Sequence, residues 1–202
     1  MLHYEAIEPG TLAILKSFMK LEEFHDFYLV DGSALALQIG HRLSVDIDLF
    51  IPGDIHTDRA RETLKTCFRV SITGEFHNTF NVLLDGIKTD LISFKYPLLE
   101  NIIEQDGIRM AGLPDISAMK LSALAQRGSK KDFFDLYFLL KEYSLEELFG
   151  FFRKKFSATE LFHITKSLTW FEDAEAEPDP VLIRKTEWKE VKAFLRKTVR
   201  TM

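Results

Sequence analysis

The stretch from Tyr28 to Phe50 constrains the fold of this chain more than any other part of the sequence. It begins with a short run of apolar β-formers, Tyr28–Val30, and continues with a helix-forming segment, Ala34–Ile39. In the next segment, Val45–Ile51, residues alternate so that two acids fall on one side of a strand and apolar residues on the other. The sequence therefore predicts a strand, a helix and a second strand that presents two carboxylates on one face.

Asp46 and Asp48 are the two acids of that strand. Like charges held close together disfavour joint ionisation, so the pair is costly unless a cation lies between the carboxylates. Magnesium binds one or two carboxylates and completes its shell with water and substrate phosphate oxygens. The turn at Gly32–Ser33 adds a residue without a Cβ, a hydroxyl and the free N–H groups of a helix start, all of which suit a phosphate. These features predict a metal–nucleotide site.

A third carboxylate, Asp90, is predicted to join this pair. It lies in a β-like run, Ile87–Phe94, which follows two other such runs, Phe68–Thr73 and Thr79–Leu84. The dipeptide Asp85–Gly86 between the last two runs is a strong hairpin signal. A half-buried carboxylate on a central strand is costly unless it is paired or bound to a metal. If the hairpin lies beside the acidic strand, Asp90 completes a cluster of three acids.

The remaining predicted elements are helices. One runs from Thr11, its predicted cap, to Phe24, and another covers residues 57–68. From residue 113 onward the sequence changes to helix alone, with Gly128 as a break and Ser129 as the next cap. Later helices are predicted at 145–156, 159–168 and 183–199. We therefore predict an α+β chain in which a catalytic core, 1–112, precedes a C-terminal helical bundle, 113–202, that completes the active-site cleft.

Composition limits the classes of partner and compartment. The net charge of −5 and pI of about 5.7 create no global field toward nucleic acid or an anionic membrane, so a polyanionic partner must be held locally. The single cysteine, Cys67, excludes an internal disulfide and fits a reducing compartment. No run approaches the roughly 20 apolar residues that span a bilayer, so we expect a cytoplasmic protein without a membrane partner.

A basic stretch, residues 184–200, follows the acidic loop 172–180. Lysine and arginine outnumber glutamate in this stretch. An ordinary charged face on a terminal helix is the favoured interpretation, and contact with RNA or phosphate is the alternative.

The combination of these motifs resembles the polymerase β-type nucleotidyltransferases, which have Gly-Ser at a strand–helix junction, Asp-x-Asp on the next strand and a third Asp on a later strand. Residues 32–50 look like the first motif of the AbiEii-type nucleotidyltransferase toxins, the toxic component of an abortive-infection toxin–antitoxin system. Three further stretches agree, namely Lys88–Asp90, Asp115 with Lys120, and Arg127–Tyr137. The resemblance covers nearly the whole chain and implies the polymerase β-type nucleotidyltransferase fold.

The resemblance also implies catalytic and binding roles. Asp46 and Asp48 would hold one or two magnesium ions, while Asp90 would ligate the second ion and accept the proton of an attacking hydroxyl. Gly32 and Ser33 would cradle the β- and γ-phosphates of a nucleotide. One ion would neutralise the triphosphate and stabilise the pyrophosphate leaving group.

Residues outside the acid strand receive further predicted roles. Lys120 is implied as a catalytic, phosphate-binding cation, and an exposed helix lysine is the alternative. Asp132 and Asp135 lie on one helix face and match the fourth motif; Asp132 is predicted to be catalytic, although helix capping explains it almost as well. Arg42, which follows His41, is predicted to touch phosphate or base. No second histidine stands at metal-ligand spacing from His41, so a zinc site is not expected.

Asp31 is the position at which this chain departs from the family. Members usually have a second glycine before Gly32, whereas this chain has an aspartate. Aspartate tolerates a positive φ better than most residues do, but it adds a negative charge near the phosphates. We therefore expect it to weaken triphosphate binding slightly.

Together these inferences predict an enzyme, a nucleotidyltransferase that uses magnesium, or manganese in its place, to move a nucleoside monophosphate from an NTP to a hydroxyl acceptor. The resemblance implies a toxin, with RNA such as tRNA or a protein as acceptor and a cognate antitoxin protein as partner. Two alternatives stay open. One is a non-catalytic nucleotide-binding or regulatory module of the same fold. The other is a small-molecule, antibiotic-type nucleotidyltransferase, whose cationic acceptor the acidic balance would suit.

Overall fold

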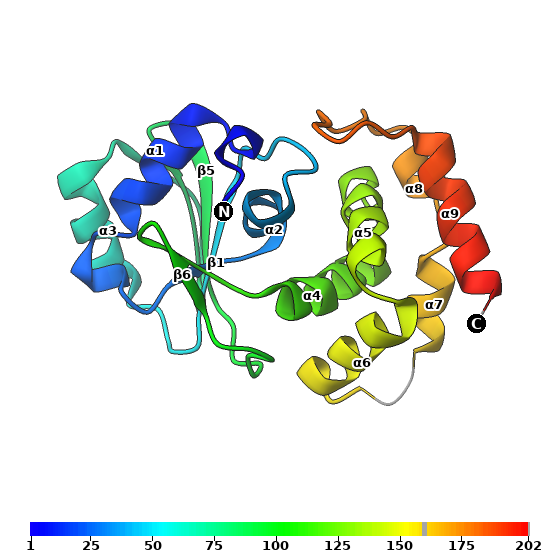
Figure 1. Cartoon of the computed structure of the whole chain (residues 1–202). Coiled ribbons are helices and arrows are strands. Elements are labelled where there is room, and N and C mark those ends of the chain that lie inside the picture. Colours follow the sequence, from blue (N-terminus) through cyan, green and yellow to red (C-terminus); the bar gives the residue numbers. More distant parts are fainter. Residues whose placement is uncertain (159–160, 202) are drawn as a thin grey trace.

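The computed structural model describes residues 1–158 and 161–201 as a mixed β-sheet with flanking helices, followed by a group of helices (Figure 1). The strands are β1 (Tyr28–Leu29), β2 (Ile47–Ile51), β3 (Val70–Phe76), β4 (Thr79–Leu84), β5 (Ile87–Ser93), β6 (Ile103–Gln105) and β7 (Ile108–Met110). The helices are α1 (Pro9–Phe18), α2 (Asp31–Ile39), α3 (Thr57–Cys67), α4 (Leu113–Gln126), α5 (Lys130–Glu142), α6 (Leu145–Phe156), α7 (Phe162–Ser167), α8 (Glu172–Glu175) and α9 (Trp188–Arg200), with 3₁₀ turns η1 (Tyr4–Ala6) and η2 (Glu22–Phe24).

The seven strands form one sheet in the order β3-β4-β5-β2-β1-β7-β6. β2 pairs in parallel with β5, and β1 in parallel with β7, whereas the other neighbours are antiparallel. On β2, Ile47 and Leu49 are buried in the core, which leaves Asp48 on the other face. Asp48 lies opposite Asp90 of β5 in the register. The predicted hairpin of β4 and β5 therefore does lie beside the acidic strand.

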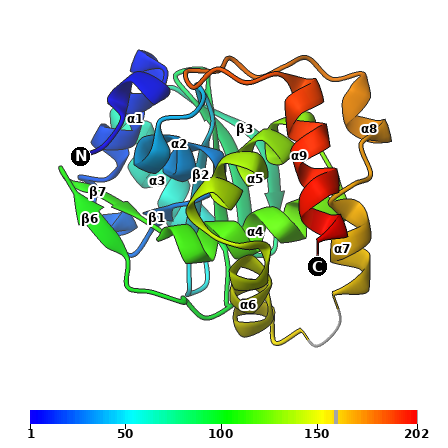
Figure 2. The ribbon, with the colours of Figure 1, turned by 45° about the vertical axis from the view of Figure 1, so that its right-hand side comes forward.

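Helices cover both faces of the sheet. Figure 1 shows α1 and α3 on one side of it, and α2 and α4 on the side that faces the helical half. Turning the view brings α4, α5 and α9 forward, so that the helical half lies in front of the sheet (Figure 2). No helix among the described residues is long and apolar enough to cross a membrane.

Two hydrophobic clusters follow this division. One joins the sheet to α1, α2 and the start of α4, and the other joins α4 to the later helices. Secondary structure changes from strand to helix between Met110 and Leu113, close to the predicted boundary. The two clusters meet along α4 and α5, so the division into domains 1–112 and 113–202 stays a prediction.

The sequence predicted most of the described helices and strands but not β6, β7 or the short helix α8, which lies in the run 172–180 that was expected to be a loop. β6 and β7 were not expected because each has only three residues and β6 contains Glu104 and Gln105. A signal was present, since Asp106–Gly107 forms the turn between them with φ values of 53° and 76°. The β7 strand matters because it pairs with β1 and thereby extends the sheet beyond the acidic strand.

Two helix predictions need correction. The first helix begins at Pro9 and ends at Phe18, and Glu8 is its cap, accepting a hydrogen bond from the N–H of Thr11 at 3.0 Å. The hydroxyl of Thr11 instead donates to the carbonyl of Val45 at 2.9 Å, so it holds the helix to the segment before β2. The helix predicted at 183–199 begins only at Trp188, because residues 181–184 pair with the segment that follows α2. The helix predicted at 159–168 starts outside the described residues; within them, α7 covers Phe162–Ser167.

After α8 the chain returns to the half that contains the sheet, along residues 181–184, here called the C-terminal strap. The N–H of Leu43 donates to the carbonyl of Val181 at 2.8 Å, and the N–H of Ile183 donates to the carbonyl of His41 at 2.9 Å. Figure 1 shows this orange segment reaching the loop that follows α2. The strap thus borders the segment that leads to Asp46, the first of the two acids predicted on the strand.

A buried ion pair anchors the loop between β5 and β6. Asp115 of α4 lies 2.6 Å from the ammonium of Lys155 on α6, and both side chains are almost fully buried. The Asp115 carboxylate also accepts hydrogen bonds from the N–H groups of Leu99 and Glu100, while Lys155 donates to the carbonyl of Pro97 at 3.0 Å. The pair therefore joins α4, α6 and this loop.

Replacing Asp115 by asparagine is expected to reduce the free energy of unfolding by about 3 kcal/mol or more, because the buried ammonium of Lys155 loses its counter-ion. Urea unfolding at neutral pH measures the loss. The matched control is Asp54→Asn, which removes an exposed pair with Lys95 and should cost below about 1 kcal/mol. Equal losses in the two variants would contradict the assignment.

Candidate active site

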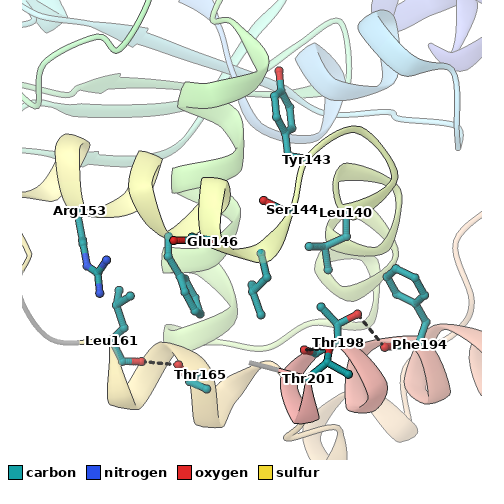
Figure 3. A pocket seen from close by; sticks show the side chains of 12 residues that line it. Leu140, Tyr143, Ser144, Glu146, Arg153, Leu161, Thr165, Phe194, Thr198 and Thr201 are labelled. Atoms are coloured by element: carbon teal, nitrogen blue, oxygen red, sulfur yellow. Dashed lines mark hydrogen bonds between the residues drawn. The ribbon is translucent and has the colours of Figure 1, made fainter.

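A cleft of about 570 Å³ lies between the sheet and α4. Asp31 of α2, Asp48 of β2 and Arg127 line it, whereas Asp46 lines a neighbouring hollow of about 350 Å³. A larger cavity of about 720 Å³ lies among α5, α6, α7 and α9, where Arg153 and Thr165 line it (Figure 3). Since none of the predicted site residues reaches that cavity, the cleft beside β2 is the candidate active site.

The structure places Asp48 and Asp90 side by side in this sheet face and Asp46 just before β2. Asp90 is largely buried, and its two oxygens accept hydrogen bonds from Asn81 and Lys88, each at 2.7 Å. Asp46 is more exposed, and its carboxylate lies 3.9 Å from the ammonium of Lys131 on α5. Asp48 has no ion pair among the described residues.

Burial and neighbouring negative charges both disfavour the ionised form of Asp48. Burial, together with the negative charges of Asp31, Asp90 and Asp46, raises the pKa of its carboxyl to about 7, while the positive charge of Lys88 lowers it. A carboxyl in this position is stabilised by any cation that enters the cleft. The acidic face therefore has unbalanced negative charge.

The donor chemistry at this face fits magnesium in part. Asp46 and Asp48 supply the one or two carboxylates that a magnesium ion bound to substrate phosphates uses. Within residues 1–158 and 161–201, however, no group of three or more His, Cys, Asp or Glu side chains is arranged to hold a metal ion. Asp90 is already paired with Lys88 and Asn81, so its predicted role as a third ligand requires those bonds to open and stays a prediction.

The turn at the start of α2 is built for close packing. Asp31, the first residue of the helix, has a φ of 53°, in the left-handed region that the sequence indicated for this position. A Cβ on Gly32 would lie 2.6 Å from Nη2 of Arg42, so only glycine admits this arginine. Ser33 is buried and its hydroxyl contacts both Ser44 and the carbonyl of Asp46. A phosphate contact at this turn would therefore come from backbone N–H groups.

Lys120 lies at the centre of a buried ionic network. Its ammonium has no exposed surface and lies 2.5 Å from Asp31, 2.9 Å from Asp132 and 2.7 Å from Asp135. Burial alone would lower the pKa of this lysine, but the carboxylates of Asp135, Asp31 and Asp132 outweigh it and raise the pKa. The alternative of an exposed helix lysine is excluded. In this arrangement Lys120 binds aspartates, and its predicted contact with phosphate stays a prediction.

Arg42 and His41 belong to the same network. The guanidinium of Arg42 donates to both oxygens of Asp135, from Nε at 2.6 Å and from Nη2 at 2.8 Å, and His41 Nε2 lies 2.7 Å from the same carboxylate. The pKa of Asp135 is held well below its ordinary value because Arg42 and Lys120 outweigh the effect of burial. Arg42 is almost fully buried, so its predicted contact with phosphate or base is not supported by this geometry and stays a prediction.

The sequence alone assigns no catalytic role to two residues of the cleft, Arg127 and Asp31. Arg127 is half-exposed, donates from Nε to Asp132 at 2.9 Å and lies 3.6 Å from Asp31, so it is a cation that both lines the cleft and belongs to the network. For Asp31 the sequence predicts only an unusual backbone geometry and an added negative charge. The signal for Arg127 was its place at the start of the Arg127–Tyr137 motif stretch. Asp132 of α5 accepts a hydrogen bond from Ser129 at 2.6 Å and lies 2.9 Å from the ammonium of Lys120 on α4, so it joins α4 to α5.

Comparison with known proteins identifies the family. The chain matches the family described as "Nucleotidyl transferase AbiEii toxin, Type IV TA system" over residues 13–100 and 86–201. The chain belongs to this AbiEii family of nucleotidyltransferase toxins. A relative from Aquifex aeolicus (strain VF5), the uncharacterized protein aq_aa25, is 38% identical over 192 residues, which are 92% of each chain.

Two solved structures are similar in fold to this AbiEii-family chain. JHP933 from Helicobacter pylori matches with a TM-score of 0.62 and 18% identity, over 96% of this chain and 92% of its own. The MenT4 nucleotidyltransferase toxin of Mycobacterium tuberculosis H37Rv also has a TM-score of 0.62, with 14% identity over 94% of this chain and 81% of its own. These matches confirm the predicted α+β nucleotidyltransferase fold.

Changing Gly32 to alanine is expected to lower the free energy of unfolding by about 1–3 kcal/mol, because the new Cβ collides with an arginine that Asp135 holds in place. Gly150→Ala is the matched control, since Gly150 also lies in a helix and an added Cβ meets nothing within 4 Å. The control should gain about 0.5–1 kcal/mol from helix propensity. Chemical denaturation measures both, and a gain for Gly32→Ala would contradict the packing described above.

Asp48→Asn is expected to stabilise the protein in a pH-dependent way. Because the pKa of Asp48 is raised in the folded state, the contribution of this carboxyl to wild-type stability is fully present below about pH 4 and is lost as the pH rises through about 7. The asparagine does not titrate, so the advantage of the variant should be small near pH 4 and reach about 4 kcal/mol above pH 7. Thermal unfolding across this range measures the difference. An advantage that does not change with pH would refute the proposed repulsion.

Proposed function

We propose that this AbiEii-family chain uses a divalent cation, magnesium or manganese, to transfer a nucleoside monophosphate from an NTP to a hydroxyl group on RNA or protein. The observation that carries the proposal is the register of β2 and β5, which sets Asp48 opposite Asp90 beside the turn that opens α2. Acids in register next to a helix start provide ligands for a metal–triphosphate complex. The family assignment supports the same reaction.

Each part of the cleft has a proposed role in this reaction. The acceptor oxygen forms a bond to the α-phosphorus of the NTP while the bond from that phosphorus to the pyrophosphate oxygen breaks. Asp46 and Asp48 hold the cation, which when bound neutralises the triphosphate and stabilises the leaving pyrophosphate. Asp90 is the candidate general base. It would accept the proton of the acceptor hydroxyl once its own hydrogen bond with Lys88 has opened. Arg127 faces the phosphates from α4.

The buried network supports the site without touching the substrate. Lys120, Asp132 and Asp135 join α4 to α5, and Asp31 joins both helices to the turn of α2. Through these contacts the network positions Arg127 and the helix start against the acidic strand. Under this proposal Lys120 and Asp132 contribute to catalysis by positioning, which differs from the phosphate contact expected for Lys120.

The biological role proposed here is that of a toxin restrained by a cognate antitoxin protein, in an abortive-infection type of system in the cytoplasm. The family description, which names a toxin of a type IV toxin–antitoxin system, supports this role. On α9, Lys192 pairs with Glu175 and Lys189 with Glu187, so part of the basic stretch is neutralised locally. Acceptor RNA, of which tRNA is the first candidate, is therefore expected to bind at the cleft rather than along α9.

A transfer assay tests the proposal. The protein is incubated with each labelled NTP, magnesium and either total RNA or protein extract, and label in the macromolecule is counted. Asp46→Ala is expected to reduce transfer at least about 100-fold and to relieve growth inhibition, because the cation loses a ligand. The control Asp58→Ala removes an exposed acid of α3 that pairs with Arg61 and should keep full activity.

Two results would reject the proposal. One is the absence of transfer from every NTP to either acceptor, combined with growth inhibition that Asp46→Ala leaves unchanged. The other is magnesium-dependent NTP binding without pyrophosphate release in any mixture, which would favour the non-catalytic module. Transfer to a cationic small molecule but not to RNA or protein would favour the antibiotic-type alternative.

A further inference from the structure

One part of the cleft is lined by aromatic side chains. Phe50, Phe94, Tyr96 and Phe156, here called the aromatic wall, all line the same cleft as Asp48 and Arg127. The rings of Phe50 and Phe94 stack with centroids 4.4 Å apart, and Tyr96 contacts both Phe94 at 5.0 Å and Phe156 at 4.9 Å. The wall is therefore one continuous apolar surface.

The order of residues along the strands places this wall next to the acids. Phe50 follows Asp48 by two residues on β2, so it lies on the same sheet face about 6–7 Å further along the strand. Ile92 follows Asp90 in the same way on β5 and also lines the cleft. A molecule that reaches from the acids along the strands therefore meets the aromatic wall next.

Helix α4 supplies a polar surface across the cleft from the wall. Ser122 and Gln126 lie one turn apart on the helix face that lines the cleft, and the Gln126 amide donates to the Ser122 hydroxyl at 2.9 Å. Arg127 follows Gln126 directly in the sequence and adds a positive charge to the same part of the cleft. The cleft thus combines a phosphate-binding part, an aromatic surface and an amide that both donates and accepts hydrogen bonds.

The loop that carries Tyr96 is held in place by buried charge. Asp115 binds the N–H groups of Leu99 and Glu100, and Lys155 binds the carbonyl of Pro97 and lies 5.3 Å from the ring centre of Phe94. Despite this anchoring, Tyr96 remains 49% exposed at the cleft. A fixed loop that presents a half-exposed ring beside an apolar surface is suited to stacking a planar ligand.

We infer that the aromatic wall is the subsite for the nucleobase of the NTP, with the base stacked on Tyr96 and its edge facing Gln126 and Ser122. This inference rests on the proposed function, because it assigns the base end of the same substrate. Stacking is tolerant of sequence, since every base has a π-face, whereas the Gln126 amide distinguishes bases by their hydrogen-bonding edges. The wall supplies affinity, and Gln126 supplies preference among the four NTPs.

Equilibrium binding compares each NTP with inorganic tripolyphosphate at the same free magnesium concentration, by calorimetry on the full chain. Tripolyphosphate has the charge of the nucleotide without its base. The wild type is expected to bind its preferred NTP at least about 10-fold more tightly than tripolyphosphate. Tyr96→Ala should weaken NTP binding about 10-fold without changing tripolyphosphate binding, and Tyr96→Phe should retain wild-type affinity because it keeps the ring.

The control Phe76→Ala removes an aromatic ring that is 70% exposed on β3, outside the cleft, and should leave both affinities unchanged. Gln126→Leu should alter the order of affinities among the four NTPs, while tripolyphosphate binding stays constant. Circular dichroism and thermal unfolding of each variant check that Tyr96→Ala and Gln126→Leu remain folded. Since both side chains are exposed, no loss of fold is expected.

The inference is overturned if the wild type binds NTP and tripolyphosphate equally, if Tyr96→Ala weakens both ligands alike, or if no NTP binds at all. The last result also removes the proposed function. Binding that depends on Tyr96, combined with no transfer to any acceptor, would retain the nucleobase subsite and reject the transferase. Failure of the inference and failure of the proposed function are therefore separate outcomes.

Discussion

The ammonium group of Lys120 has no exposed surface and lies among the carboxylates of Asp31, Asp132 and Asp135. Removing such a charge from water costs several kcal/mol, which only close and well-directed counter-ions offset. Three cations, those of Lys120, Arg42 and Arg127, meet three carboxylates in this network. The arrangement holds α2, α4 and α5 in one relative orientation, because moving any one helix would leave a buried charge without a partner.

The network also determines which charged side chains remain available to bind a substrate. Its cations are matched by its own aspartates, whereas Asp48 has no ion pair among the described residues and a pKa raised by burial and by neighbouring acids. The ionised form of Asp48 is therefore left without a partner in the described part of the cleft. A polyanion enters such a site only together with cations, so charge balance explains why the reaction proposed for this cleft includes a divalent metal. Arg127 differs from the other cations of the network, because it is half-exposed and can also face a substrate.

The sequence predicted the acidic strand and the hairpin because both depend on local patterns. Alternation places Asp48 away from the core, and Asp85–Gly86 supplies the turn that brings Asp90 beside it. The partners of Lys120 and Arg42 could not be predicted. Residue spacing can place a cation near an acid, but it does not show whether the two form a buried ion pair or remain open to a ligand. Asp135, 93 residues from Arg42, receives that arginine only after the helical half has packed. The β6–β7 hairpin was missed because each strand has only three residues, too few for an alternating pattern to stand out.

The C-terminal strap makes the shape of the cleft depend on residues that are far apart in the chain. His41 and Leu43, which precede the acidic strand, find backbone partners in residues 181–184. Without these contacts the segment that leads to Asp46 would lack one of its borders. The loop before the acidic strand therefore reaches its final position only when the helical half has packed against it, so the two halves of the chain cannot form the cleft independently.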